Sequence, residues 1–217
     1  AQIGQYAENV YYGKPSGLMD QMASSVGGLV FIDFNDPKMP VVEKVDYDFA
    51  HSGYTLCTID SGADHADLTD EYAAMPIEMK KVAAFFGKEV LREVDEQEFY
   101  AKIAEIRKET GDRAVLRAIH YFEENARTLA QRDALQAGQF AVFAALVLES
   151  GRASFALCQN VYCSTDVRHQ GLSVALALSQ SILQGSTGAW RMQGGGFAGT
   201  IQAYVPQSLL ERYHSEI

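Results

Sequence analysis

Cysteine is scarce in this sequence, and the few cysteines have no informative spacing. The 217 residues contain three, Cys57, Cys158 and Cys163. An odd number without a Cys-x-x-Cys pair indicates neither a disulfide framework nor a zinc site. We therefore expect reduced thiols and a cytoplasmic location.

Basic residues and long apolar runs are also in short supply. Lysine and arginine number 18 against 28 acidic residues, which gives a net charge of −10. Nucleic acid is excluded as a partner, because phosphate backbones require clustered basic side chains. No apolar run approaches the ~20 residues of a membrane-spanning helix, and no signal-peptide pattern opens the sequence, so we expect no membrane partner.

What the sequence does have is an ordinary globular composition, with 47% hydrophobic and 21% charged residues. Strand patterns cover 28–34, 41–49 and 54–60, where Val41, Val45, Tyr47 and Phe49 would share one face. Helical patterns cover 1–13, 16–27, 67–87, 95–108, 112–137, 140–148 and 172–182, and a last strand covers 198–205 before a short helix. This order predicts an α+β fold in which a mixed or antiparallel sheet is covered by a layer of helices.

Two local signals predict how individual helices begin and break. Ser16 is placed to cap a helix that runs through Met19 and Met22. Pro76 should interrupt or restart the helix over 67–87, because proline lacks the backbone N–H and clashes with the preceding turn.

Three consecutive glycines, Gly194, Gly195 and Gly196, form the most informative local feature. They remove every side chain from a short stretch of backbone and permit positive φ, so another group can approach closely. Strand formers follow over 200–205, which places the glycines at the entry of a strand. Free N–H groups there can meet a phosphate or a neighbouring loop, and a β-bulge or tight turn is the alternative.

A single carboxylate, Asp20, stands in an otherwise small and apolar stretch. It could simply favour the start of a helix, since acids in the first turn complement the helix dipole. Alternatively it could act as a general base toward a substrate hydroxyl, with Leu18 and Met19 excluding water. An isolated acid and a bare backbone together suggest phosphoryl transfer.

An acidic turn with a histidine follows the third strand pattern, at Asp60, Asp64, His65 and Asp67. It has no established metal-ligand spacing, and helix capping by Asp67 explains much of it, so we predict no metal site in this chain. Tyr72, just beyond, could offer its phenol to a polar ligand or lie at a helix interface.

Six segments together match a known pattern. They cover residues 3–9, 16–21, 29–34, 65–72, 124–128 and 191–199. On these segments the chain resembles the galactokinases, members of the GHMP small-molecule kinase family, over essentially its whole length. The specific pair is Gly-x-Met-Asp-Gln at 17–21 and Arg-x-x-Gly-Gly-Gly-Phe-x-Gly at 191–199.

The resemblance implies transfer of the γ-phosphate of ATP, with Mg²⁺, to the anomeric hydroxyl of galactose. Asp20 matches the family's catalytic aspartate, and Gly17 and Tyr72 match positions that contact the sugar. Gly194, Gly195 and Gly196 match a motif that supports the phosphate-binding loop.

The resemblance also implies a C-terminal portion. The family's Gly-Glu-His-Thr-Asp sugar motif, its catalytic arginine and its Gly-Leu-Ser-Ser-Ser phosphate loop with the Mg²⁺ ligands have no match in this sequence. Residues 1–50 would form the tail of the N-terminal kinase domain, and residues 51–217 a GHMP kinase C-terminal domain truncated at its end. We expect this chain alone to be inactive, with ATP and Mg²⁺ bound mainly by the part it lacks.

Three other functions remain open: a non-catalytic sensor of galactose and ATP, a GHMP kinase for another sugar, and a folding unit without ligand affinity. Asp20 and the full glycine run favour the enzyme, and the 17–21 segment with Glu71 and Tyr72 favours galactose. The sequence gives neither the oligomeric state nor whether Asp20 removes a proton or only stabilises charge.

Overall fold

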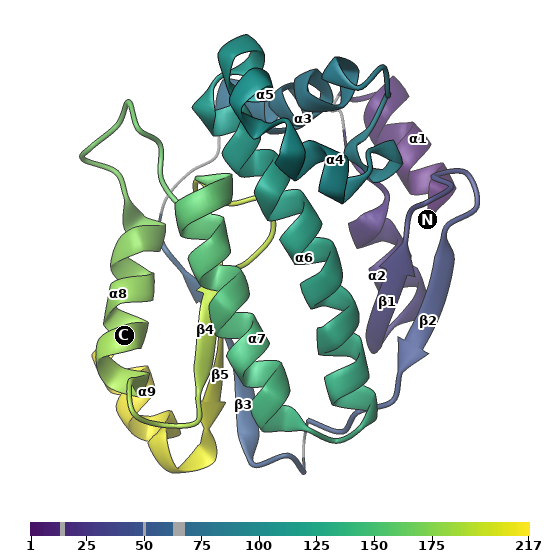
Figure 1. The fold of residues 1–217 in the computed structure, drawn as a ribbon. Coiled ribbons are helices and arrows are strands. Elements are labelled where there is room, and N and C mark those ends of the chain that lie inside the picture. The colour runs from purple at the N-terminus through teal and green to yellow at the C-terminus, as the bar shows by residue number, and fades with distance from the viewer. Residues whose placement is uncertain (14–15, 50, 63–67) are drawn as a thin grey trace. The chain divides into compact units, whose positions relative to one another are not determined.

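The computed structural model describes residues 1–217 except 14–15, 50 and 63–67, and it divides into two compact units (Figure 1). Unit 1 comprises Ala1–Tyr47 with Leu135–Gly138, and unit 2 comprises Asp48–Ala134 with Gln139–Ile217. The assignment of 1–50 and 51–217 to two kinase domains stays a prediction.

The described residues of unit 1 form two short helices and a two-stranded sheet. The helices are α1 (Gln2–Val10) and α2 (Met19–Val26), and the strands are β1 (Leu29–Asp33) and β2 (Val41–Val45). The strands are antiparallel, with Leu29 opposite Val45 and Asp33 opposite Val41. The apolar run predicted as a strand over 28–34 is thereby confirmed.

Two predictions for unit 1 were wrong. Helix α2 has Leu18 at its N-cap with no side-chain bond, so Ser16 does not cap it; the Ser16 N–H instead donates to Asn9 Oδ1 at 2.8 Å. Strand β2 ends at Val45, so the strand face predicted over 41–49 is cut short. Val41, at the other end of the strand, is 64% exposed, whereas Val45 is buried.

Unit 2 is built on a three-stranded antiparallel sheet with the order β3-β5-β4. The strands are β3 (Tyr54–Asp60), β4 (Ala189–Met192) and β5 (Thr200–Pro206). Tyr54 pairs with Pro206 and Asp60 with Thr200, while Met192 of β4 pairs with Ile201. Strand β4 was not predicted, because four residues that run directly into glycines carry no readable alternation.

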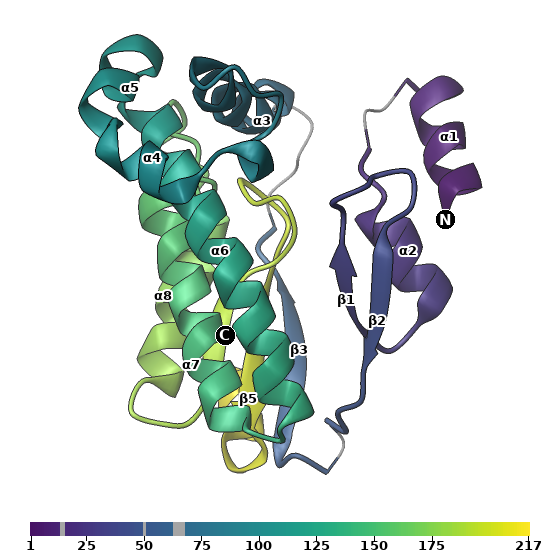
Figure 2. The same cartoon turned by 45° about the vertical axis from the view of Figure 1, so that its right-hand side comes forward.

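Helices form the second layer of unit 2, on one side of the sheet (Figures 1 and 2). Their bounds are α3 (Thr69–Phe85), η1 (Leu91–Glu93), α4 (Glu96–Ala101), α5 (Ile103–Thr110), α6 (Asp112–Gln136), α7 (Phe140–Ala153), the π-helical turn η2 (Ser154–Cys158), α8 (Gly171–Leu183), η3 (Gln207–Leu209) and α9 (Leu210–Glu216). Helices α7 and α8 pack on β4, and α9 packs against α8 and β5. The predicted α+β fold with an antiparallel sheet and a helix layer is confirmed.

Two helical predictions need correction. Helix α3 continues through Pro76 without interruption, and its second half is anchored by the fully buried Val82 and Ala83. Tertiary packing of this kind overrides the local penalty of an internal proline. The helix predicted over 95–108 instead breaks at Lys102 into α4 and α5, and Asp95 caps α4 by accepting the N–H of Glu98 at 2.8 Å.

Apolar clusters of described residues pack the interior of unit 2. One joins α3, α5 and α6 through Val82, Ile106 and Ala118, and another joins α9 to the sheet through Val205 and Tyr213. The third packs Leu172 of α8 against Met192 and Ile201, which end β4 and begin β5. The two strand ends that flank the glycine run are therefore held by the core.

One helical segment in the described part of the chain is long and apolar enough, by length and composition, to cross a membrane. It is the 19-residue stretch Phe140–Cys158, formed by α7 and η2. The expectation concerned uninterrupted apolar runs, and this segment contains Glu149 and Arg152. Its buried residues include Phe143, Ala144 and Val147, and it packs on β4; the core helix of a globular protein passes the same test.

Candidate functional site

The glycine run forms the connection between β4 and β5. The Gln193 N–H donates to the Thr200 carbonyl at 3.0 Å and closes the base of this loop. Gly194 and Gly196 have φ of +73° and +88°, a region that glycine enters without steric penalty. The predicted place of the glycines at the entry of a strand is confirmed.

Two side chains from other elements close against this loop. Tyr72 of α3 donates its hydroxyl to the Gly196 carbonyl. Asn160, two residues beyond η2, donates its side-chain amide to the Gly195 carbonyl at 3.0 Å. A Cβ added at Gly195 would lie 2.6 Å from Tyr72 Cε1, and one at Gly196 would lie 1.9 Å from the Asn160 carbonyl oxygen. Glycine is thus required at these two positions by the packing of Tyr72 and Asn160.

The loop turns its carbonyls into the protein and leaves N–H groups free. Among the described residues, no acceptor bonds the N–H groups of Gly194, Gly195 and Gly196. Gly194 and Gly195 are exposed. Successive free N–H groups in a turn of alternating φ form a concavity that suits an anionic oxygen.

Ser61, just after β3, fixes the far end of the loop. Its N–H and its hydroxyl both donate to the Gly199 carbonyl, at 2.9 and 2.6 Å. Helix α8 begins against the same residue, since a Cβ at Gly171 would lie 2.5 Å from the Ser61 carbonyl oxygen. Strand β3, helix α8 and the glycine loop therefore meet at Ser61.

A partly buried ion-pair network fixes the helix that carries Tyr72. Glu78 of α3 accepts from Arg113 of α6 at 2.7 Å and from Arg117 at 2.9 Å. Arg117 is fully buried and also donates Nε to the Cys158 carbonyl at 3.0 Å. This arginine thereby joins α3, α6 and the segment that leads to Asn160. Burial raises the pKa of the Cys158 thiol to about 11, so the thiol stays protonated.

Sequence reasoning missed Asn160, Glu78 and Arg117. A lone asparagine in a loop and charged residues on helices are typical of solvent-exposed positions, so nothing in the pattern marks them. Their importance comes from contacts with residues distant in the sequence.

Asp20 and Gly17 belong to unit 1, whereas Tyr72 and the glycine loop belong to unit 2. Asp20 lies in the first turn of α2, and the Gln21 amide donates to Glu8 of α1 at 3.0 Å. Asp20 is exposed and Met19 is 56% exposed, so unit 1 does not itself supply the apolar shield that was predicted for this carboxylate. A Cβ at Gly17 would meet no atom within 4 Å.

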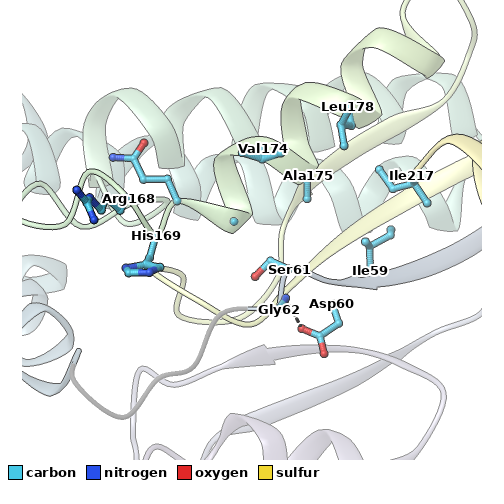
Figure 3. A pocket seen from close by; sticks show the side chains of 12 residues that line it. Ile59, Asp60, Ser61, Gly62, Arg168, His169, Val174, Ala175, Leu178 and Ile217 are labelled. Carbon is cyan, nitrogen blue, oxygen red and sulfur yellow. Dashed lines mark hydrogen bonds between the residues drawn. The ribbon is translucent and has the colours of Figure 1, made fainter.

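A cavity of about 390 Å³ opens where β3 ends and α8 begins (Figure 3). Its apolar lining includes Ile59, Val174 and Leu178, and Arg168 lies on its polar side. The Asp60 carboxylate accepts the N–H of Gly62 at 2.9 Å.

Asp64, His65 and Asp67 of the predicted acidic turn lie outside the described residues. Among the residues that the structure describes, there is no group of three or more His, Cys, Asp or Glu that could hold a metal ion. The absence of a metal site in this chain stays a prediction.

Comparison with known proteins gives one consistent result. No family model matches this chain. The curated galactokinases of Actinobacillus pleuropneumoniae serotype 5b, Glaesserella parasuis serovar 5 and Mannheimia succiniciproducens are 32%, 31% and 31% identical to it, each over 97% of this chain and 52% of their own length.

A solved structure supports the same fold. The crystal structure of Lactococcus lactis galactokinase complexed with galactose matches 99% of this chain and 53% of that protein, with a TM-score of 0.75 and 23% sequence identity. The chain spans about half the length of the curated relatives it matches. In sequence and in fold, this chain is therefore similar to galactokinases, and the match fits a C-terminal portion of such a protein.

Proposed function

We propose that the whole protein is an ATP-dependent sugar kinase that phosphorylates the anomeric hydroxyl of galactose to galactose 1-phosphate. The observation that carries this proposal is the clamped glycine loop, with its free N–H groups, in a chain similar to galactokinases along 97% of its length. This chain alone is inactive, because it corresponds to about half of such an enzyme.

The glycine loop would support the phosphoryl group. Three adjacent N–H groups without a protein acceptor among the described residues fit a negatively charged oxygen, and their fixed direction stabilises charge without reorganisation. ATP would supply the transferred group and Mg²⁺ would neutralise its charge, both held mainly by the other half of the enzyme. The residues of this chain contribute the loop and part of the sugar site.

Asp20, Gly17 and Tyr72 would act on the sugar. The Asp20 carboxylate accepts the proton of the anomeric hydroxyl or stabilises the charge that develops there. Gly17 leaves room for the sugar, consistent with the open space beside it. The Tyr72 hydroxyl already donates to Gly196, so it would accept a hydrogen bond from a sugar hydroxyl, since a phenol can do both.

The test is a coupled assay of ADP release on the full-length protein, with galactose against a panel of other hexoses. Asp20→Asn keeps the shape of the side chain but removes its charge, and we expect kcat to fall by about 10²–10⁴. Gln2→Ala on exposed α1 serves as the control and should leave kcat unchanged.

Each result assigns one function. Turnover of galactose supports the proposal, and turnover of another hexose alone indicates a kinase for that sugar. Binding of galactose without turnover of any sugar indicates a sensor. We further propose that the protein is cytoplasmic, which cell fractionation tests.

A further inference from the structure

We propose that Asn160 is a positioning residue for phosphoryl transfer, because it fixes the direction of the free N–H group of Gly196 in the glycine loop. This inference rests on the proposed function and assigns a role to a residue outside the predicted site. Three observations support it: the hydrogen bonds between Asn160 and the loop, the left-handed turn at Gln159 that fixes Asn160, and the side-chain Oδ1 that has no partner among the described residues.

Asn160 contacts the loop on both sides of Gly196. Its side-chain amide donates to the Gly195 carbonyl at 3.0 Å, and its backbone carbonyl accepts the Phe197 N–H at 2.5 Å. The C=O and the following N–H of one planar trans peptide point in opposite directions. A Gly195 carbonyl turned toward Asn160 therefore directs the Gly196 N–H away from it.

The position of Asn160 is fixed by the turn before it. Gln159 has φ +54° and ψ +46°, a left-handed conformation uncommon for a residue other than glycine. The Gln159 N–H donates to the Ser154 carbonyl at 2.8 Å, and Arg117 holds the carbonyl of Cys158. Strained backbone of this kind persists only where the surrounding structure enforces it.

The amide of Asn160 has only one orientation that fits. Asn160 is 5% exposed, and its Oδ1 has no hydrogen-bond partner among the described residues. The flipped amide would set Oδ1 against the Gly195 carbonyl and lose the one bond that the side chain makes. The donor capacity of Asn160 is thus its essential property toward the loop.

Steady-state kinetics of the full-length protein test this role. Asn160→Ala removes the donor and the volume, and Asn160→Asp keeps the volume but replaces the donor with an acceptor. We expect kcat to fall about three- to tenfold for Asn160→Ala, the loss of one hydrogen bond, and at least as much for Asn160→Asp. KM for galactose should stay within about twofold, because Asn160 contacts the loop and not the sugar.

Ser154→Ala is the matched control. Ser154 is 1% exposed and lies in the π-helical turn that precedes Asn160, but its side chain makes no hydrogen bond to the glycine loop among the interactions of the described residues. Its kcat should equal that of the wild type. A wild-type kcat in Asn160→Asp, or an equal fall in Ser154→Ala, overturns the positioning role.

Hydrogen exchange separates this inference from the proposed function. The Phe197 N–H donates to the Asn160 carbonyl, and the Ala198 N–H donates to the Gly196 carbonyl. Both N–H groups should therefore exchange faster in the Asn160 variants than in Ser154→Ala. If the wild type phosphorylates no sugar, the proposed function fails and the kinetic role fails with it. Hydrogen exchange then tests on its own whether Asn160 holds the glycine loop. An unchanged exchange rate of the Phe197 N–H in the Asn160 variants would show that it does not.

Discussion

A methyl group added at Gly196 tests whether the glycine loop is shaped by its neighbours. The Cβ of alanine would lie 1.9 Å from the Asn160 carbonyl oxygen, on backbone with φ +88°. Left-handed φ in alanine costs about 1–2 kcal/mol, and forcing apart packed backbone adds about 1–3 kcal/mol. Gly196→Ala should therefore lower the free energy of unfolding of unit 2 by about 2–5 kcal/mol.

Gly194→Ala measures the cost of a positive φ in alanine without the steric overlap that a Cβ meets at Gly196. Gly194 also has positive φ, at +73°, but a Cβ there would meet no atom within 4 Å. We expect a loss of about 1–2 kcal/mol from backbone strain alone. Urea unfolding followed by the fluorescence of Trp190, the single tryptophan, reports on β4 and thus on unit 2. Equal losses in the two variants would refute the argument that Asn160 excludes a side chain at Gly196.

Three further changes test the surroundings of the loop. Tyr72→Phe removes the donor to the Gly196 carbonyl, so the free energy of unfolding should fall by about 0.5–1.5 kcal/mol and KM for galactose should rise. Arg117→Met removes the donor to the Cys158 carbonyl and one of the two arginines that bond Glu78, which keeps Arg113, so it should cost about 1–3 kcal/mol in urea unfolding; an unchanged free energy of unfolding contradicts this. Burial lowers the pKa of His120 below its ordinary 6.5, so the unfolded chain binds the proton first, and stability falls as pH drops below 6.5. His120→Gln should flatten that part of the stability profile, and an unchanged slope would show that another group causes it.

The elements that the sequence predicted well are those whose pattern is local and long enough. Strand β3 was predicted with its observed bounds, because its seven residues alternate between two environments. Strand β4 was missed, and the break at Lys102 was hidden by good helix formers on both sides. Pro76 predicted a break that the structure does not have, because packing of α3 keeps the helix continuous.

The candidate site shows the same division. The glycine run was recognisable because three consecutive glycines are informative without any partner. Its partners were not, since Asn160 lies 35 residues from Gly195 and Arg117 lies 41 residues from Cys158. Contacts of this kind depend on the tertiary fold, and one sequence carries no signal for them.

Through Asn160, the π-helical turn Ser154–Cys158 makes the shape of the glycine loop depend on the number of residues in that turn. Its bond from Gln159 N–H to the Ser154 carbonyl spans five residues, one more than an α-helical bond. Deleting one residue there would restore α-helical spacing and rotate the downstream residues by about 100°, one residue's share of a 3.6-residue turn. Asn160 would then point away from the loop. In proteins of this fold, a single-residue gap in this turn should therefore accompany a different residue, or a different partner, at Gly196.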